Sequence, residues 1–243
     1  MLKFNETIRA EGKLKHLGVI MDGNRRWAKT HKLELYQGHN AGAENFGHLC
    51  DWCLKEKIPY VTVYAFSTEN WKRTDKEINH LFSLMEKYFL KEKSNCVEKG
   101  VRLKIIGERG RFSSRVSSVI NDIENATRDC KNLQVQIALS YGGRDEIIRA
   151  VKKIAAEVSH GGLKLENLTE QLFENYLDTA GIPDVDLVIR TGGAENRRLS
   201  NFLPWQTVYS ELYFSDLLWP EFTKEEFDRA VAYYYSVKRK LGK

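Results

Sequence analysis

Residues able to do chemistry gather directly after an apolar run near the start of the chain. Residues 17–21 read LGVIM, which is the length and composition of a buried strand, and residues 22–24 read DGN, which ends a strand in a turn. Asn24 is the predicted N-cap of a following helix, and Gly23 lets the backbone approach a ligand closely. Asp22 therefore lies at the carboxyl end of a strand, beside free amide groups.

The first turn of this predicted helix is basic, because Arg25, Arg26 and Lys29 all lie near its start. Guanidinium groups, free amides and the positive end of a helix dipole together favour a phosphate or diphosphate. Asp22 adds the opposite charge, and one carboxylate beside an anion site is a common way to share Mg²⁺ with phosphate oxygens. The alternative is an ordinary strand, turn and helix with a solvated basic turn.

Polar residues also follow two other predicted strands. The strands at residues 58–66 and 185–189 run into the sequences STENW at 67–71 and RTGG at 190–193. The carboxyl ends of parallel strands share one edge of a sheet, where ligands bind in open α/β folds. The three strand ends would gather acids, amides, hydroxyls and arginines into a crevice that suits two diphosphates and a metal. Neither a GxxxxGK[ST] loop nor a strand-linked GxGxxG occurs, which disfavours a P-loop or dinucleotide fold.

Strands and helices alternate along the chain, which predicts an α/β fold. Helical spacing covers residues 41–54, 75–99, 113–129, 144–158, 169–177 and 224–240, and further strands are predicted at 101–107 and 133–140. We expect a single domain with a central, mainly parallel sheet and helices on both faces. Residues 1–13 are predicted to be a polar tail, and residues 14–243 form the rest of the chain without a linker or repeat.

Composition and charge limit the possible partners. The chain has 243 residues, a formal net charge of +5 and a pI near 8.9, which fits acidic small molecules, a membrane surface or nucleic acid. No nucleic-acid signature accompanies the charge, so we expect no nucleic-acid partner. No segment resembles a signal peptide or a membrane span, which predicts a cytoplasmic protein. Cys50 and Cys53 lack a second pair, so a reduced core role is favoured over a metal or redox site.

Several longer motifs run through the chain in order: MDGNRRWAK at 21–29, GH at 38–39, YAFSTENW at 64–71, SYGGR at 140–144, DLVIRTGG at 186–193, LSNF at 199–202, WQ at 205–206 and ELYF at 211–214. Together they resemble the cis-prenyltransferases, with undecaprenyl diphosphate synthase as the nearest activity. The resemblance implies that residues 14–243 are a homodimeric α/β catalytic domain with an apolar tunnel. It implies Mg²⁺-dependent addition of isopentenyl diphosphate to an allylic starter, usually farnesyl diphosphate, with new double bonds in cis. The implied product is undecaprenyl diphosphate for cell-wall lipid carrier synthesis, with peripheral membrane contact for its release.

The resemblance also implies roles for individual residues. Asp22 would place Mg²⁺, Glu211 would be a second metal ligand reaching across a dimer, and Asn70 would accept a proton. The implied substrate-binding residues are Gly23, Asn24, Arg25, Arg26, Trp27 and His39 at the allylic diphosphate; Ser67, Thr68, Glu69, Trp71 and Arg73 along the site; and Arg190, Arg198 and Ser200, with Leu199 between them, at isopentenyl diphosphate.

The chain departs from the family pattern near both diphosphate sites. Arg25 stands where bacterial members usually carry Gly, and Leu35 stands where a further Arg is expected. We expect the lost arginine to weaken the allylic site and Arg25 to supply the missing charge. Residues 193–200 form a longer segment than the family pattern has. Counting back from Ser200 assigns the diphosphate ligand to Arg198, whereas counting forward from Gly193 leaves Glu195 and Arg197 as contenders for that position.

Two residues bear on the length of the product, and two alternative functions without catalysis remain open. Ala65 is small at a position that lines the family's tunnel, and Leu133 lies near its far end, which favours a medium or long product. Alternatively, both residues and the apolar stripe of 75–99 simply pack in the core. A silent accessory subunit or an isoprenoid-binding module would share the fold, although the acid and arginine positions are all retained.

Overall fold

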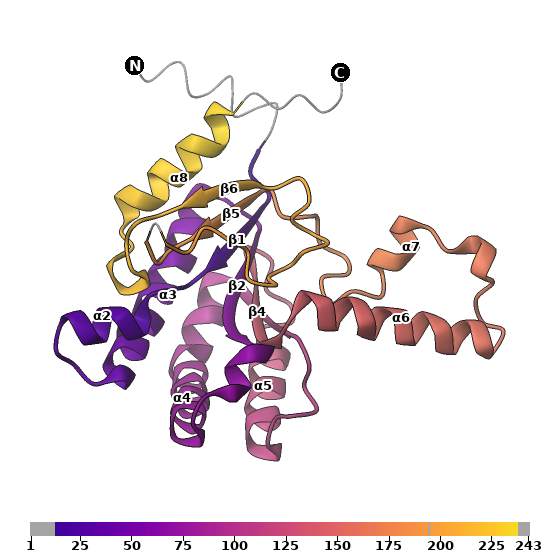
Figure 1. The fold of residues 1–243 in the computed structure, drawn as a ribbon, viewed down its shortest axis with the longest axis horizontal. Helices are drawn as coiled ribbons and strands as arrows, with labels where there is room; N and C mark the ends of the chain where they lie inside the picture. The colour runs from indigo at the N-terminus through magenta and orange to yellow at the C-terminus, as the bar shows by residue number, and fades with distance from the viewer. Residues whose placement is uncertain (1–12, 194, 238–243) are drawn as a thin grey trace.

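Six parallel strands in the order β3-β4-β2-β1-β5-β6 form the centre of the computed structural model, which describes residues 13–193 and 195–237 (Figure 1). They are β1 (His16–Ile20), β2 (Tyr60–Ser67), β3 (Val101–Ile106), β4 (Leu133–Tyr141), β5 (Leu187–Arg190) and β6 (Glu211–Phe214). Every neighbouring pair is parallel, so the predicted mainly parallel sheet is confirmed and is parallel throughout. The carboxyl ends of all strands therefore share one edge.

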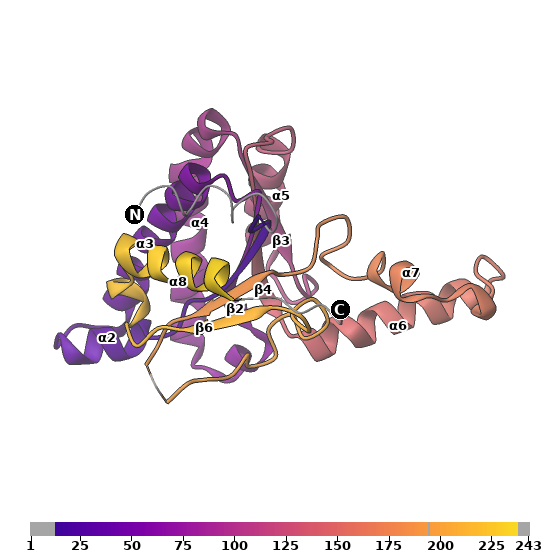
Figure 2. The same ribbon diagram turned by 90° about the horizontal axis from the view of Figure 1, so that it is seen from above.

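Helices fill the connections, as the α/β prediction requires. They are α2 (Asn24–Thr30), α3 (Leu35–Glu56), α4 (Asp75–Lys99), α5 (Ser114–Ala126), α6 (Gly143–Ser159), α7 (Glu170–Glu174) and α8 (Lys224–Ser236), with short 3₁₀ turns η1 (Thr68–Lys72), η2 (Leu165–Asn167) and η3 (Trp219–Glu221). Figures 1 and 2 show α3, α4, α5 and α8 stacked on one side of the sheet, while α6 and α7 extend away from it. None of the described helices is long and apolar enough to cross a membrane.

The two faces of the sheet bury different clusters, because alternate strand residues point in opposite directions. Leu17 and Val19 of β1 belong to the large core under the helices, together with Leu49 of α3. Ile20 belongs to a smaller cluster on the other face, where Phe202 covers the sheet. The larger core thus lies between the sheet and these helices.

Several local predictions need correction. The N-cap of α2 is Gly23 rather than Asn24, since Gly23 takes the left-handed conformation with φ 117° and the helix begins one residue earlier. Helix α3 begins at Leu35, before the predicted residue 41, because Glu34 and Gln37 form a capping box. The polar residues after β2 form the 3₁₀ turn η1, and β6 was not predicted as a strand. Residues 1–12 of the predicted tail and 238–240 of the predicted last helix lie outside the described residues.

The predicted core role of Cys50 and Cys53 agrees with the structure. Cys53 is fully buried in the large cluster, Cys50 packs against it, and both are free thiols. Burial raises the pKa of the Cys53 thiol well above its ordinary value. An unreactive, protonated thiol is what such a core position favours.

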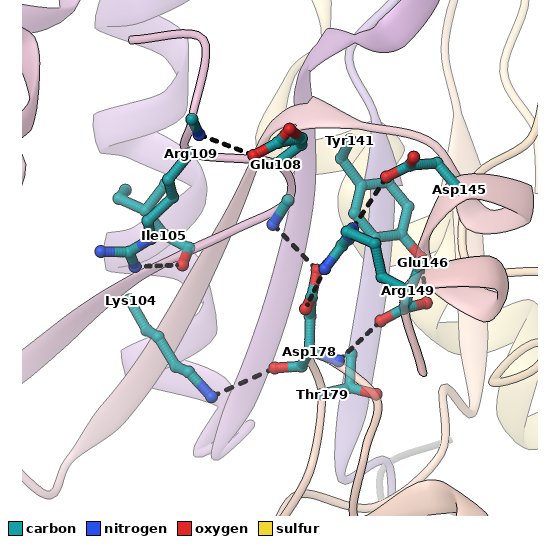
Figure 3. Close-up of polar contacts among 12 residues, drawn as sticks. Lys104, Ile105, Glu108, Arg109, Tyr141, Asp145, Glu146, Arg149, Asp178 and Thr179 are labelled. Atoms are coloured by element: carbon teal, nitrogen blue, oxygen red, sulfur yellow. Dashed lines mark hydrogen bonds and ion pairs between the residues drawn. The ribbon is translucent and has the colours of Figure 1, made fainter. Parts of the chain in front are cut away.

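A buried polar network joins α6 to the segment before β5 (Figure 3). Glu146 Oε2 accepts hydrogen bonds from Tyr141 Oη at 2.6 Å and Gln206 Nε2 at 3.1 Å, and Glu146 Oε1 accepts one from the backbone N of Asp178 at 2.9 Å. Asp178 in turn binds both terminal nitrogens of Arg149, at 2.7 and 2.8 Å. Burial raises the pKa of Glu146, while hydrogen bonds from Tyr141 and Gln206 act in the opposite direction. The network ties the projecting helix to the sheet.

Replacing Glu146 by Ala is expected to lower the free energy of unfolding by about 3 kcal/mol, since two buried hydrogen bonds and one part-buried hydrogen bond lose their acceptor. Urea denaturation followed by circular dichroism measures the change. Lys152→Ala removes an exposed charged side chain from the same helix and serves as the control, with an expected midpoint close to that of the parent chain. Equal midpoints for both variants would show that the network does not stabilise the fold.

Candidate functional site

Two cavities share a wall at the carboxyl edge of β1 and β2. The polar cavity, of about 390 Å³, is lined by residues 21–26 and by three further side chains, namely Lys29, His39 and Arg73. The apolar cavity, of about 150 Å³, lies between the sheet and the helices α3 and α4. Met21, Asn24 and His39 line both cavities. A molecule with an anionic head and an apolar tail matches this pair of spaces.

Asp22 lies two residues beyond β1, where contacts from the end of β5 hold it. Thr191 Oγ1 accepts a hydrogen bond from the backbone N of Asp22 at 3.0 Å and donates one to its carbonyl oxygen at 2.7 Å. One carboxylate oxygen lies 3.2 Å from Arg26 Nη2, and the other lies 2.9 Å from Arg190 Nη2. The predicted acid thus connects two of the predicted arginines, and its side chain is 32% exposed.

Two glycines allow this close packing. Gly23 has φ 117°, and a Cβ there would lie 2.9 Å from Leu218 Cβ. Gly192 has φ 113°, and a Cβ there would lie 2.6 Å from Arg26 Nη2 and 3.0 Å from Asp22 Cβ. A side chain at either position would meet both steric crowding and backbone strain, so the turn after β1 and the turn after β5 depend on glycine.

Arg190 is the most buried arginine of the site, with a side chain only 6% exposed. Its Nη1 donates to Ser200 Oγ at 2.7 Å and to the carbonyl oxygen of Arg198, while its Nη2 faces Asp22. Arg190 and Ser200 are therefore brought together as predicted. Arg198 touches them through its backbone, and its side chain is exposed, as is that of Arg197.

Three buried polar atoms of predicted site residues have no hydrogen-bond partner among the described residues. They are Asn24 Oδ1, His39 Nε2 and Arg190 Nε. Asn24 and His39 line both cavities, whereas Arg190 lies in the lining of neither. Buried donors and acceptors are normally paired, so the unpaired atoms of Asn24 and His39 mark a place where a ligand can supply the missing partners. This observation supports ligand binding at the predicted residues.

Arg25 and Arg73 both line the polar cavity, and both face Glu77. The Arg73 Nη1 to Glu77 Oε1 distance is 3.0 Å, and the Arg25 Nε to Glu77 Oε1 distance is 3.8 Å. His39 lies nearby, and burial lowers its pKa to about 4, assisted by the charges of Arg73, His80 and Arg25. The imidazole is therefore neutral at pH 7, and arginine and lysine supply the positive charge of the cavity.

The η1 turn holds the predicted residues after β2. Asn70 Oδ1 accepts a hydrogen bond from the backbone N of Ser67 at 3.1 Å, so the oxygen of the predicted proton acceptor caps the turn. Glu69 Oε1 accepts a bond from Asn201 Nδ2 at 3.2 Å, and a Cβ at Gly142 would lie 2.6 Å from Thr68 Oγ1. These contacts join η1 to the starts of α6 and of the segment after Ser200.

Trp71 and two other predicted residues make mainly structural contacts. Trp71 Nε1 donates to Ser140 Oγ at 2.9 Å, and its ring lies under the guanidinium of Arg111, 4.4 Å from the ring centroid. Trp27 packs on His31 with ring centroids 4.5 Å apart, outside the lining of both cavities. Leu199 packs against the smaller core cluster. None of these three side chains lines the polar cavity that holds the basic residues Arg25, Arg26, Lys29 and Arg73.

The tunnel prediction is supported for one of its two residues. Ala65 lines the apolar cavity, as do Phe82, Met85 and Phe89 from the apolar stripe of α4. Leu133 lies at the start of β4, buried in the core and away from the cavity wall. The position of Leu133 near the far end of a tunnel stays a prediction.

Glu211 is far from Asp22 within one chain. It pairs with Leu187 at the start of β5, and Leu187 pairs with Leu17 of β1, so Glu211 lies near the amino ends of the strands. Asp22 lies five residues further along the chain than Leu17, about 16 Å at the usual strand rise. Across the described parts of the chain, no group of three or more His, Cys, Asp or Glu could hold a metal ion. A cation at Asp22 would therefore need oxygens from elsewhere.

Sequence reasoning missed two contributors to the site. Thr191 and Glu77 both contact predicted residues directly. Thr191 lies in the motif DLVIRTGG at 186–193, directly after Arg190, and this position could have indicated that it belongs to the site. Glu77 stands three residues after Thr74, the spacing of a helix cap, and the backbone N of Glu77 donates to Thr74 Oγ1. This local role of the Glu77 backbone gives no sign that the Glu77 side chain contacts the arginines.

Comparisons with known proteins agree with the geometry. The family model described as putative undecaprenyl diphosphate synthase matches residues 20–242. An isoprenyl transferase of Aquifex aeolicus is 43% identical over 228 residues, covering 94% of this chain and 95% of the relative. A tritrans,polycis-undecaprenyl-diphosphate synthase (geranylgeranyl-diphosphate specific) of Picrophilus torridus is 42% identical over 229 residues, covering 93% of this chain and 89% of the relative.

Solved structures show the same architecture. Lavandulyl diphosphate synthase from Lavandula x intermedia, in complex with dimethylallyl diphosphate, superposes with a TM-score of 0.90 at 31% identity, covering 94% of this chain and 98% of that chain. A probable undecaprenyl diphosphate synthase from Campylobacter jejuni gives a TM-score of 0.79 at 38% identity, covering 96% of this chain and 100% of that chain. The chain belongs to the undecaprenyl diphosphate synthase family of cis-prenyltransferases.

Proposed function

We propose that this cis-prenyltransferase condenses isopentenyl diphosphate units with farnesyl diphosphate, or another allylic diphosphate, and that its product is undecaprenyl diphosphate for cell-wall lipid carrier synthesis. The observation that carries the proposal is the shared wall of the two cavities. Basic side chains line one, apolar side chains line the other, and Met21, Asn24 and His39 line both. An allylic diphosphate has this division between head and tail.

The arginines have a clear task in such a reaction. Cleavage of the allylic carbon–oxygen bond leaves a diphosphate with growing negative charge, so fixed guanidinium groups stabilise the departing group more than the intact substrate. Arg26 and the backbone amides after Asp22 would bind the allylic diphosphate, while Arg190 and Ser200 would bind that of isopentenyl diphosphate. Holding the second substrate by its own diphosphate aims its double bond at the reacting carbon.

Asp22 fits a role in holding Mg²⁺. A carboxylate oxygen is a preferred ligand of Mg²⁺, which commonly binds one or two carboxylates together with substrate phosphates and water. The Asp22 side chain is 32% exposed beside the polar cavity, within reach of a diphosphate there. When bound, Mg²⁺ would supply positive charge against the departing diphosphate. Asp22 also orients Arg26 and Arg190 through its two oxygens.

We also propose that the protein is a homodimer in the cytoplasm. The dimer would contact the membrane peripherally and release its lipid product there. Large apolar side chains are exposed beside the edge strand β6 and on α6: Val208 is 66% exposed, Tyr209 87% and Ile148 53%. Exposed apolar patches commonly mark protein interfaces. In such a dimer Glu211 of the partner subunit would be the second metal ligand, because Glu211 of the same chain lies at the far end of the sheet.

The decisive assay incubates purified protein with labelled isopentenyl diphosphate, Mg²⁺ and either farnesyl or geranylgeranyl diphosphate. Extraction of label into butanol is expected, and chromatography of the product gives its length. Faster turnover with geranylgeranyl diphosphate would favour the starter named for the Picrophilus torridus relative. Absence of extracted label from a folded protein would contradict the proposed turnover and favour an isoprenoid-binding module.

Replacing Arg198 by Ala is expected to raise the KM for isopentenyl diphosphate by about tenfold, the effect of losing one charge-assisted hydrogen bond. Arg197→Ala is the matched control, since both side chains are exposed on the same segment. Steady-state kinetics with varied isopentenyl diphosphate measures the change. A larger effect from Arg197 would reverse the assignment that comes from counting back from Ser200.

A further inference from the structure

One carboxylate lies among three basic side chains at the edge of the polar cavity. Glu77 Oε1 is 3.0 Å from Arg73 Nη1, 3.8 Å from Arg25 Nε and 3.9 Å from His39 Nε2. The Glu77 side chain is 14% exposed, whereas that of Arg25 is 47% exposed. The carboxylate is therefore largely buried, and Arg25 and Arg73 line the polar cavity whereas Glu77 does not.

The backbone fixes the position of Glu77. It lies in the first turn of α4, and its backbone N donates to Thr74 Oγ1 at 3.3 Å. Arg73 precedes this helix, whereas Arg25 lies in α2, so the two guanidinium groups come from separate elements. Glu77 is the side chain that both of them face.

Without an acidic neighbour, the two arginines would repel one another. Like charges that share a site separate into solvent unless an opposite charge holds them. Glu77 offsets one of the two charges and leaves a net positive charge to attract an anion. His39 adds no charge at pH 7, because its pKa is lowered by burial.

We propose that Glu77 is a positioning residue that holds Arg25 and Arg73 as a paired clamp for the allylic diphosphate, an assignment that rests on the proposed function. Through this clamp, Arg25 compensates for the arginine that the chain lacks at Leu35. Leu35 lies at the start of α3, outside the lining of the polar cavity, whereas Arg25 and Arg73 both line it.

Removing Glu77 has opposite expected effects on diphosphate binding, depending on whether Glu77 positions the arginines or acts only through its charge. If Glu77 acted only as one more negative charge near the cavity, then removing it would strengthen diphosphate binding. If it positions the arginines, then removing it disperses them and weakens binding. Glu77→Ala is therefore expected to weaken the binding of inorganic diphosphate by about tenfold, the loss of one hydrogen-bonded ion pair.

Isothermal titration with inorganic diphosphate measures the affinity, and steady-state kinetics measures both KM values. The KM for the allylic substrate is expected to rise in Glu77→Ala, with little change in the KM for isopentenyl diphosphate. Glu77→Gln, which keeps a hydrogen-bond acceptor for Arg73, should lose less affinity than Glu77→Ala. Asp75→Ala removes an exposed carboxylate from the same helix turn and is the control, with parental affinity expected.

A double-mutant cycle completes the test. In an Arg25→Gly background, Glu77→Ala should cost less affinity than in the parent chain, because one member of the clamp is already absent. Unchanged or tighter diphosphate binding in folded Glu77→Ala would overturn the assignment. A parent chain that binds diphosphate through Glu77-dependent contacts but transfers no prenyl group would contradict the proposed function alone.

Discussion

Replacing Asp22 by Asn is expected to lower the kcat for prenyl transfer by about a thousandfold while leaving the fold intact. Asn has nearly the same size and keeps one acceptor oxygen, but it removes the charge that pairs with Arg26 and Arg190. It also removes the carboxylate through which Mg²⁺ would be held. Turnover of labelled isopentenyl diphosphate at saturating substrates measures the loss, and a thermal melt checks the fold.

The same variant has a second readout that does not involve turnover. Without Mg²⁺, Asp22→Asn is expected to bind inorganic diphosphate with near-parental affinity, because the repelling charge is removed while the amide keeps one acceptor oxygen for the arginines. Asp228→Asn changes an exposed aspartate on α8 and is the matched control for both measurements. Parental turnover by Asp22→Asn would mean that this carboxylate is not the essential acid.

Features with a local cause could be predicted from the sequence. The apolar run before Asp22 and the polar residues after it predicted a strand end, and strand–helix alternation predicted a parallel sheet with those ends on one edge. The structure confirms both. It also brings Asp22, Arg26 and Arg190 into contact, as sequence reasoning expected. Chemistry at strand ends is predictable because the carboxyl ends of parallel strands share one edge, and the strand order then places the ends of β2 and β5 on either side of β1.

Features that depend on packing between distant segments could not be predicted in this way. The capping role of Gly23 depends on a φ of 117°, which residue identity permits but does not require. β6 is short and its register comes from pairing with β5, a partner that local periodicity does not reveal. Glu77 was not singled out from the sequence, because its ion pair with Arg25 depends on how α2 packs against the rest of the fold.

Asn70 shows the limit of transferring a role by position. The resemblance implies that it accepts a proton, yet its Oδ1 already accepts a hydrogen bond from the backbone N of Ser67. An amide oxygen has a second lone pair, so one bond does not exclude another. What the geometry supports directly is that Asn70 maintains the shape of η1, and through it the position of Glu69 beside Asn201.

Replacing Arg190 by Lys is expected to raise the KM for isopentenyl diphosphate by about fiftyfold, even though the charge is kept. The guanidinium bonds Asp22 through Nη2 and Ser200 through Nη1, and it leaves a buried Nε without a partner among the described residues. A lysine has one nitrogen on a flexible chain and cannot keep these directions together. Steady-state kinetics with each substrate varied in turn measures the change.

The pattern of the two KM values distinguishes substrate binding from a structural effect of this substitution. If Arg190 binds the second diphosphate, then the KM for isopentenyl diphosphate rises much more than that for the allylic substrate, because Arg26 and the turn after β1 remain in place. If Arg190 serves mainly to hold Asp22, then kcat falls and neither KM changes much, as in Asp22→Asn. Arg229→Lys on the exposed face of α8 is the matched control, since its side chain is 71% exposed. A parental KM for isopentenyl diphosphate in Arg190→Lys would therefore move the second diphosphate site away from β5, towards the exposed arginines after Gly193.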